Sequence, residues 1–133
     1  MKPLKIDRII FLLMIFMTIA ACNRDEDSVL LKFLGTYQVN DSCGYTNTAY
    51  SMEISVKNEN TKEIYLKNFG GYGSTVSARV SDDNPDHIII NTNADNLHIT
   101  GEGVINNERT RIVFTYETSN NGVSVSCSSE ANK

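Results

Sequence analysis

Apolar and polar residues alternate along most of this chain with a period of two. In the clearest segment, residues 50–57 read Tyr-Ser-Met-Glu-Ile-Ser-Val-Lys. Successive side chains of a β-strand point to opposite faces of the sheet, so this pattern predicts a half-buried strand. Similar segments recur to the end of the chain, and no helix-length period follows Leu34.

Clusters rich in Asn, Asp and Gly separate the alternating segments and supply the residues that tight turns between antiparallel strands require. The pattern predicts eight strands, at 33–40, 49–57, 62–68, 74–81, 86–92, 96–105, 110–118 and 122–128. Because closure removes exposed sheet edges, we expect an all-β, antiparallel up-and-down meander that closes into a small barrel. A two-sheet β-sandwich is the alternative.

The first residues follow another pattern, a basic start and then an apolar run from Ile9 to Ala20. As a helix this run is too short for the ~30 Å of bilayer hydrocarbon, and it predicts a signal peptide. Its end, Ile19-Ala20-Ala21-Cys22, resembles the lipobox of bacterial lipoproteins. The resemblance implies that residues 1–21 are removed and that Cys22 carries the lipid. An ordinary secretory signal cut near Ala21 is the alternative.

Residues 22–32 are predicted to form an acidic tether and a short helical turn, which Ser28 could cap. The acidic cluster resembles signals that send lipoproteins of some two-membrane bacteria to the outer face of the outer membrane. A generic charged linker explains the cluster equally well. The expected location is therefore the outer membrane, reached by export and held by the lipid, with the choice of face left open.

Removal of residues 1–21 leaves one domain, at 33–133, and changes the charge balance. The removed segment holds three of the 12 lysines and arginines and one of the 16 aspartates and glutamates, so the mature chain carries a net charge of −6. This charge disfavours nucleic acid and anionic lipid as partners. With Cys22 acylated, Cys43 and Cys127 remain as a pair in an oxidising compartment, and we expect a disulfide between them. Two free thiols are the alternative.

The start of the first strand supplies a second resemblance. Residues 33–37, Phe-Leu-Gly-Thr-Tyr, resemble the Gly-x-Trp start of lipocalins and other calycin barrels, with Tyr37 in the place of the Trp. The chain contains no Trp, and after the last strand only Lys133 is available for the arginine that packs over that aromatic in the family. The resemblance implies a calycin-like architecture.

The sequence offers little for catalysis or metal binding. His87 lies at a strand start and His98 on a polar face, and no Ser or Cys sits in a recognisable nucleophile motif. Asp82, Asp83 and Asp86 could gather around calcium, but the segment lacks the glycine and closing glutamate of an EF-hand loop, and an ordinary turn explains it. We therefore predict no enzyme activity, no metal and no cofactor.

Two features bear on the barrel interior. Residues 101–103, Gly-Glu-Gly, place two positions without side chains in the sixth strand, as a bulge, a barrel bend or an approaching ligand would require. The inward aromatics Tyr37, Tyr50, Phe114 and Tyr116 could line a cavity or fill the barrel. For a domain of this size we favour filling.

Because successive strands of the meander run in opposite directions, the turns between them alternate between the two ends of the barrel. The turns near 57–61, 81–86 and 106–109 should lie at the tethered end, and loops 40–48, 69–74, 92–96 and 119–122 at the distal end. The distal loops offer Tyr45, Phe69 and Tyr72 among small polar residues, a mixture that recognition loops use. The alternative is that these are only turn residues. The same alternation places Cys43 and Cys127 at opposite ends, which conflicts with the expected disulfide.

Together these observations predict a non-enzymatic, lipid-anchored envelope lipoprotein that acts as a binding or interaction module. Its partner, besides the membrane reached through the lipid, would be a protein, a glycan or a small apolar ligand. One alternative is a carrier of a small apolar ligand within the barrel, and another is a structural or assembly component of an outer-membrane complex.

Overall fold

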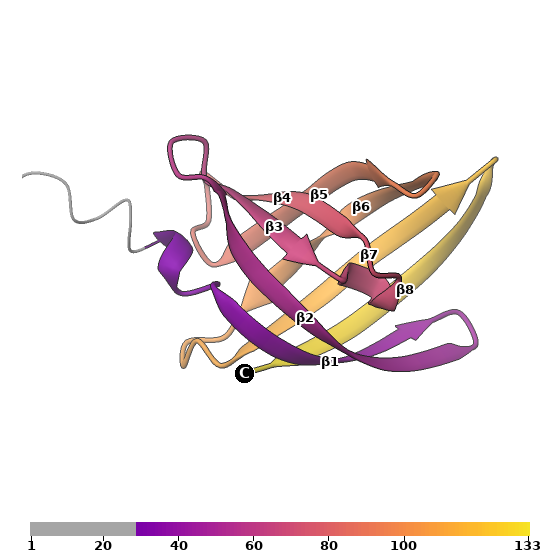
Figure 1. The fold of residues 1–133 in the computed structure, drawn as a ribbon, viewed down its shortest axis with the longest axis horizontal. Helices are drawn as coiled ribbons and strands as arrows, with labels where there is room; N and C mark the ends of the chain where they lie inside the picture. Colours follow the sequence, from indigo (N-terminus) through magenta and orange to yellow (C-terminus); the bar gives the residue numbers. More distant parts are fainter. Residues whose placement is uncertain (1–28) are drawn as a thin grey trace, which may run out of the picture.

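An antiparallel barrel closes on itself in the computed structural model, which describes residues 29–133 (Figure 1). Its strands are β1 (Gly35–Cys43), β2 (Thr46–Asn58), β3 (Glu63–Lys67), β4 (Thr75–Val80), β5 (His87–Ala94), β6 (Leu97–Ile105), β7 (Arg111–Asn120) and β8 (Val123–Asn132). Each strand pairs with its neighbours in the chain, and β1 pairs with β8. The predicted eight-strand meander and its closure are confirmed. The predicted signal peptide, Cys22 and the acidic cluster lie outside the described residues.

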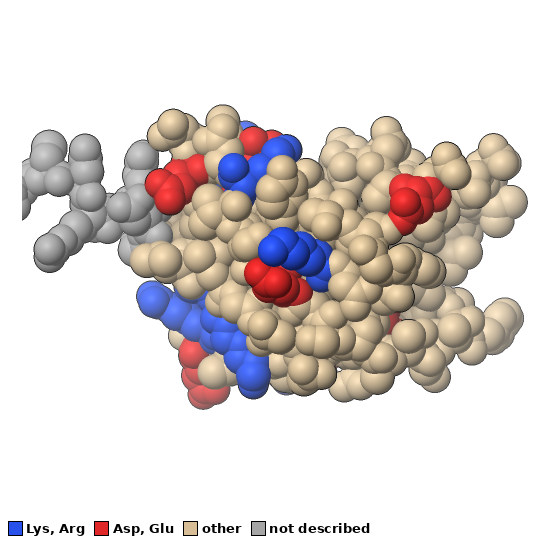
Figure 2. Space-filling view, in the orientation of Figure 1, with Lys and Arg blue, Asp and Glu red and all other residues tan. Residues whose placement is uncertain are grey.

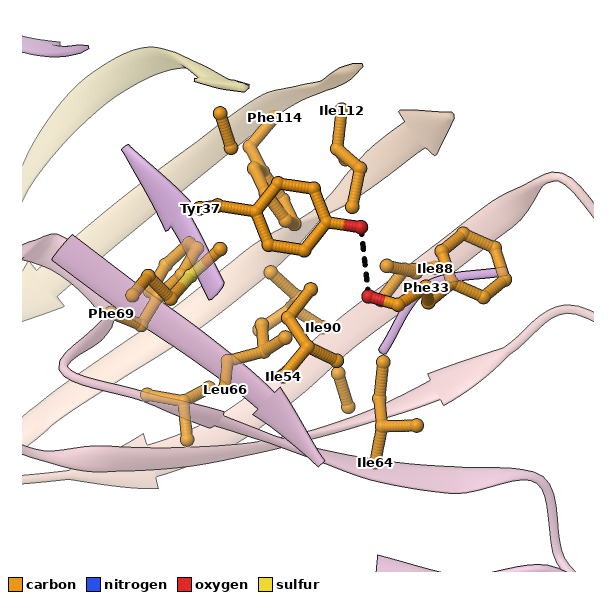
Figure 3. Packing of buried hydrophobic residues seen from close by; sticks show 14 of the residues in the cluster. Phe33, Tyr37, Ile54, Ile64, Leu66, Phe69, Ile88, Ile90, Ile112 and Phe114 are labelled. Carbon is orange, nitrogen blue, oxygen red and sulfur yellow. Dashed lines mark hydrogen bonds between the residues drawn. The ribbon is translucent and has the colours of Figure 1, made fainter. Parts of the chain in front are cut away.

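Alternating residues of every strand fill the interior. Large buried side chains among them are Tyr37, Met52, Ile54, Ile64, Leu66, Ile88, Ile90, Ile112, Phe114 and Tyr116. Figure 3 shows the labelled side chains among them pointing toward one another, and the buried residues together form one contiguous hydrophobic cluster. The expectation that the barrel is filled by its own side chains is therefore confirmed.

The tethered end of the barrel is sealed by a helical turn at 29–31 and the residues after it. Phe33 is buried, and its carbonyl oxygen accepts a hydrogen bond of 2.8 Å from the Tyr37 hydroxyl (Figure 3). Lys133 Nζ lies 5.2 Å from the centroid of the Tyr37 ring and donates to the carbonyl oxygen of Lys32 at 3.0 Å. Burial lowers the pKa of Lys133 from its usual value. The last residue thus ties the C-terminal strand to the N-terminal turn.

Gly101 and Gly103 make room for aromatic side chains. A Cβ atom at Gly101 would lie 2.4 Å from the Thr115 carbonyl oxygen, and one at Gly103 would lie 2.5 Å from the Phe114 ring. The register of β6 with β7 is continuous, so of the two structural expectations, a bulge or a barrel bend, the bulge is wrong. The glycines instead let β7 and its inward rings pack closely across β6, which leaves no space there for a ligand.

The disulfide between Cys43 and Cys127 is present, and it shows why the two cysteines seemed too far apart. β1 continues to Cys43 instead of ending near residue 40, and β8 continues to Asn132 instead of ending at 128. Cys127 therefore lies in the middle of β8, directly opposite Cys43, with their Cα atoms 4.2 Å apart. With 84 residues between the two cysteines, the chain-entropy model gives a stabilisation of about 4 to 5 kcal/mol.

The two ends of the barrel differ in charge. Lysine and arginine side chains lie near the tethered end and over the middle of the wall, whereas the distal end is largely uncharged in the view of Figure 2, apart from one acidic patch. The hairpins β1–β2, β5–β6 and β7–β8 project at this distal end (Figure 1). Within residues 29–133, no helix is long and apolar enough to span a membrane.

Candidate functional site

An aromatic floor forms the distal limit of the filled core. Phe69 packs against Phe114 with ring centroids 5.3 Å apart, and against Tyr116 with centroids 4.8 Å apart. Phe69 is only 1% exposed, so its predicted role as an exposed loop anchor is wrong. The short helix η1 (Phe69–Gly71) turns this side chain inward, because Asn68 and Gly70 take left-handed backbone conformations with φ of 62° and 74°.

A buried carboxylate lies on the distal side of this floor. Asp41 continues the inward alternation of Tyr37 and Val39 along β1, and it is only 6% exposed. Its Oδ2 atom accepts hydrogen bonds from the hydroxyls of Tyr50, at 3.1 Å, and of Tyr116. The Tyr50 hydroxyl in turn accepts a hydrogen bond of 2.9 Å from the backbone N–H of Gly70. These contacts connect β1, β2, β7 and η1 through one carboxylate oxygen.

The second carboxylate oxygen of Asp41 has no hydrogen-bond donor among the described residues. The polar atom recorded near Oδ1 is Cys43 Sγ, at 3.8 Å, and a sulfur in a disulfide has no hydrogen to donate. None of the ion pairs formed within residues 29–133 includes Asp41. Buried charges are usually paired or fully hydrogen-bonded, since leaving one unpaired is costly. Within the described residues, the Oδ1 atom of Asp41 therefore remains free to accept a hydrogen bond.

A concavity of about 230 Å³ reaches Asp41 from the distal end. We call it the mouth, and its walls are formed by Asp41, Cys43, Thr46, Thr48, Gly70, Tyr72, Thr118 and Val125. Three threonines, the disulfide and one aromatic ring thus surround the carboxylate. Asp41 is the only wall residue that carries a charge. The mouth is therefore polar and has the capacity to bind a group that donates hydrogen bonds.

The other predicted binding residues take different places. Tyr72 belongs to the wall of the mouth and is 59% exposed, while Tyr45 is fully exposed at the tip of the β1–β2 hairpin and outside the wall. Tyr50 reaches the mouth only through its hydrogen bond to Asp41. Tyr37 is buried at the tethered end. The structure thus brings Tyr50 and Tyr72 together around η1, but not the five residues as one set.

The sequence reasoning missed Asp41 itself. The signal is the alternation in the first strand, where Tyr37 and Val39 share a face and Asp41 is the next residue on it. The predicted strand stops at residue 40, and residues 40–42 are all polar, so no apolar residue marks its continuation. If this alternation is continued by two residues, it places the carboxylate of Asp41 inside the barrel.

The remaining sequence candidates lie apart from the mouth. His98 contacts Asn93, and His87 lies 3.5 Å from Glu102. Asp82 pairs with Lys62. In the part of the chain that is described, no group of three or more His, Cys, Asp or Glu side chains could hold a metal ion.

Larger concavities lie elsewhere, among them one of about 280 Å³ whose wall includes Leu30, Leu31 and Val56. One of about 330 Å³ lies over β6 and β7, where its wall includes the outward-facing Val104 and Val113. One of about 300 Å³ lies along β1 and β2, where its wall includes the outward-facing Ser42 and Asn47. The mouth is smaller than each of these, but in it the free carboxylate oxygen lies beside the hydroxyls of the wall.

Comparisons with known proteins support the fold only. No family model and no curated protein sequence matches the chain. A redesigned β-barrel is similar with a TM-score of 0.56 at 14% identity, over 79% of this chain and 94% of the other. A protein described as a "putative outer membrane protein" of Bacteroides fragilis matches with a TM-score of 0.48 at 18% identity. That match covers 79% of this chain, which spans about half (52%) of the other.

The buried tyrosines predict how the protein behaves at alkaline pH. Burial raises the pKa of Tyr37, Tyr50 and Tyr116 above the usual 10, and for the latter two the Asp41 carboxylate raises it further. Below pH 10 these residues are protonated in both the folded and the unfolded chain, so their contribution to stability is complete. Above pH 10 the unfolded chain releases these protons while the folded chain retains them, so stability falls as the pH rises.

Tyrosinate absorbance during an alkaline titration measures this effect. Fewer than the six tyrosines of the chain should ionise while the barrel remains folded, and the rest should ionise together with unfolding. In Asp41→Asn, ionisation within the folded state should begin at lower pH, because the carboxylate that disfavours tyrosinate is gone. Six tyrosines ionising in one step near pH 10 in the folded protein would contradict the described burial.

Proposed function

We propose that the mature protein is a lipid-anchored binding module of the bacterial envelope, with no catalysis of its own, which recognises its ligand at the mouth. The observation that carries this proposal is Asp41, whose buried carboxylate keeps one oxygen free at a concavity. A fold that needed only a stable core would place an apolar residue at this inward position. The retained carboxylate is instead suited to a group that arrives from outside.

The filled interior argues for binding at the mouth rather than inside the barrel. A carrier of an apolar molecule needs a cavity lined by apolar side chains, typically of about 300 Å³ or more. In this chain Phe69, Phe114 and Tyr116 occupy the distal part of the interior. The space left for a ligand lies beyond these rings and is bordered by hydroxyls and a carboxylate.

Two observations support the envelope location, and a third indicates how the barrel would be oriented there. The Ile19-Ala20-Ala21-Cys22 segment resembles a lipobox. The Cys43–Cys127 disulfide suits an oxidising compartment outside the cytoplasm. The described chain enters the barrel at the sealed end, opposite the β1–β2 and β7–β8 hairpins (Figure 1), which contribute residues to the wall of the mouth. Anchored through Cys22, the barrel would therefore present its mouth away from the membrane.

The lipid anchor is tested by replacing its attachment residue. Cys22→Ser should abolish labelling by a fatty-acid probe and release the protein from membranes, whereas the wild-type chain is labelled and sediments with them. The intact mass of the wild-type mature protein gives an independent reading. An unmodified cysteine at its N-terminus, or membrane retention of the serine variant, would contradict the anchor.

Binding at the distal end is tested with the protein recovered from its native membranes. Mass spectrometry identifies the molecule that copurifies, and its affinity is then measured with variants. Tyr45→Ala and Tyr72→Ala should each weaken binding by more than about 1 kcal/mol, as anchoring aromatics do. Tyr65→Ala, on the outward face of β3, is the matched control and should bind normally. Unchanged affinity in both distal variants, with the fold intact by circular dichroism, would place the site elsewhere.

A further inference from the structure

We infer that the mouth binds a primary ammonium group, which donates a hydrogen bond to the free oxygen of Asp41. The inference rests on the proposed function and gives its ligand a chemical class. Asp41 is the only charged residue of the wall, and no cationic side chain of the described chain pairs with it. A cation that enters the mouth would therefore compensate a buried charge that the fold leaves uncompensated.

The hydrogen-bond pattern distinguishes an ammonium from a guanidinium. Oδ2 of Asp41 already accepts from the hydroxyls of Tyr50 and Tyr116, so only Oδ1 is open. A guanidinium binds a carboxylate best through two parallel bonds to both oxygens, and this geometry is blocked. An ammonium is a compact charge with three N–H donors. One of them can bond to Oδ1, and the others can bond to the threonine hydroxyls of the wall.

The remaining wall residues favour an organic ammonium over a metal ion or a quaternary amine. Calcium takes six to eight oxygen ligands, commonly from several carboxylates, and the mouth offers one carboxylate. A quaternary ammonium has no N–H and is bound by cages of aromatic rings, whereas Tyr72 is the one ring in this wall. Tyr72 can still add a cation–π contact to a primary ammonium, and Val125 can contact its carbon stem.

The volume of the mouth limits how much of the ligand enters. About 230 Å³ is below the ~300 to 1,000 Å³ of sites that enclose a drug-sized molecule. The mouth therefore holds an ammonium head and a short stem, and the remainder of a larger ligand would stay outside. The same head group occurs on free small amines and on lysine side chains.

The test uses the full lipidated protein in a neutral detergent and n-butylammonium as the probe, with dissociation constants from ligand-observed NMR. At equal ionic strength, n-butylammonium should bind at least tenfold more tightly than 1-butanol, tetramethylammonium and n-butylguanidinium. Equal binding of 1-butanol would show that charge is not recognised. Equal or tighter binding of either of the other two cations would show that the group is not a primary ammonium. Either result overturns the inference.

Variants assign the binding to Asp41. Asp41→Asn keeps the size of the side chain but removes its charge, and it should weaken n-butylammonium binding at least tenfold. Glu117→Gln makes the same charge change on the outward face of β7 and should stay within twofold of wild type. Thr118→Val removes one hydroxyl of the wall with Asp41 intact and should weaken binding about threefold, which keeps the test decisive if Asp41→Asn does not fold. Wild-type affinity in the folded wall variants overturns the inference.

Two further measurements are needed. One distinguishes a lysine side chain from a free amine as the source of the ammonium group. The other distinguishes a failure of the ammonium inference from a failure of the proposed function. A capped lysine tripeptide that binds as tightly as n-butylammonium assigns the site to a lysine of a protein partner. Much weaker binding of the peptide assigns it to a free amine. If no amine binds but the copurifying molecule still depends on Tyr72, the ammonium inference is wrong and the mouth remains the site. If the affinity of that molecule is also unchanged in Tyr45→Ala and Tyr72→Ala, the proposed function is wrong as well.

Discussion

The pairing of β1 with β8 is the contact on which the rest of this structure depends. It closes the meander over six register pairs, from Gln38↔Asn132 to Cys43↔Cys127, and the disulfide locks the last of them. This register directs Asp41 to the interior and brings it within reach of Tyr116 on β7. A shift of one residue would turn every side chain of β1 to the other face, and the carboxylate would then lie on the outer wall.

The two ends of the closed barrel differ in whether their polar groups have partners within the protein. At the tethered end the polar groups have protein partners: Tyr37 donates to Phe33, Lys133 donates to Lys32, and Lys32 pairs with Asp86. At the distal end the core finishes in aromatic rings, and beyond them one oxygen of a buried carboxylate has no donor within residues 29–133. The polar groups named at the first end have partners in the protein, whereas at the second end we propose that a ligand supplies the missing donor.

The alternation of residue types predicted the fold because each strand has one buried face. It predicted strand ends poorly where both faces are polar. Residues 40–48 have almost no apolar residues, and a long loop was expected there, although β1 and β2 continue as a hairpin with a turn at Gly44 and Tyr45. The direction of Phe69 could not be predicted either, because it depends on the backbone conformations of Asn68 and Gly70. Six of the eight wall residues of the mouth lie in or next to these two segments, which explains why the sequence indicated the distal end but not Asp41.

A crystal structure of the mature protein grown with n-butylammonium would show directly whether the mouth binds an ammonium group through Asp41. The account predicts the amine nitrogen in the mouth, about 2.7 to 3.2 Å from Asp41 Oδ1, with Oδ2 still bonded to Tyr50 and Tyr116. It would be contradicted by an Asp41 whose two oxygens are both satisfied by donors of the protein itself, or by an amine bound only away from the mouth.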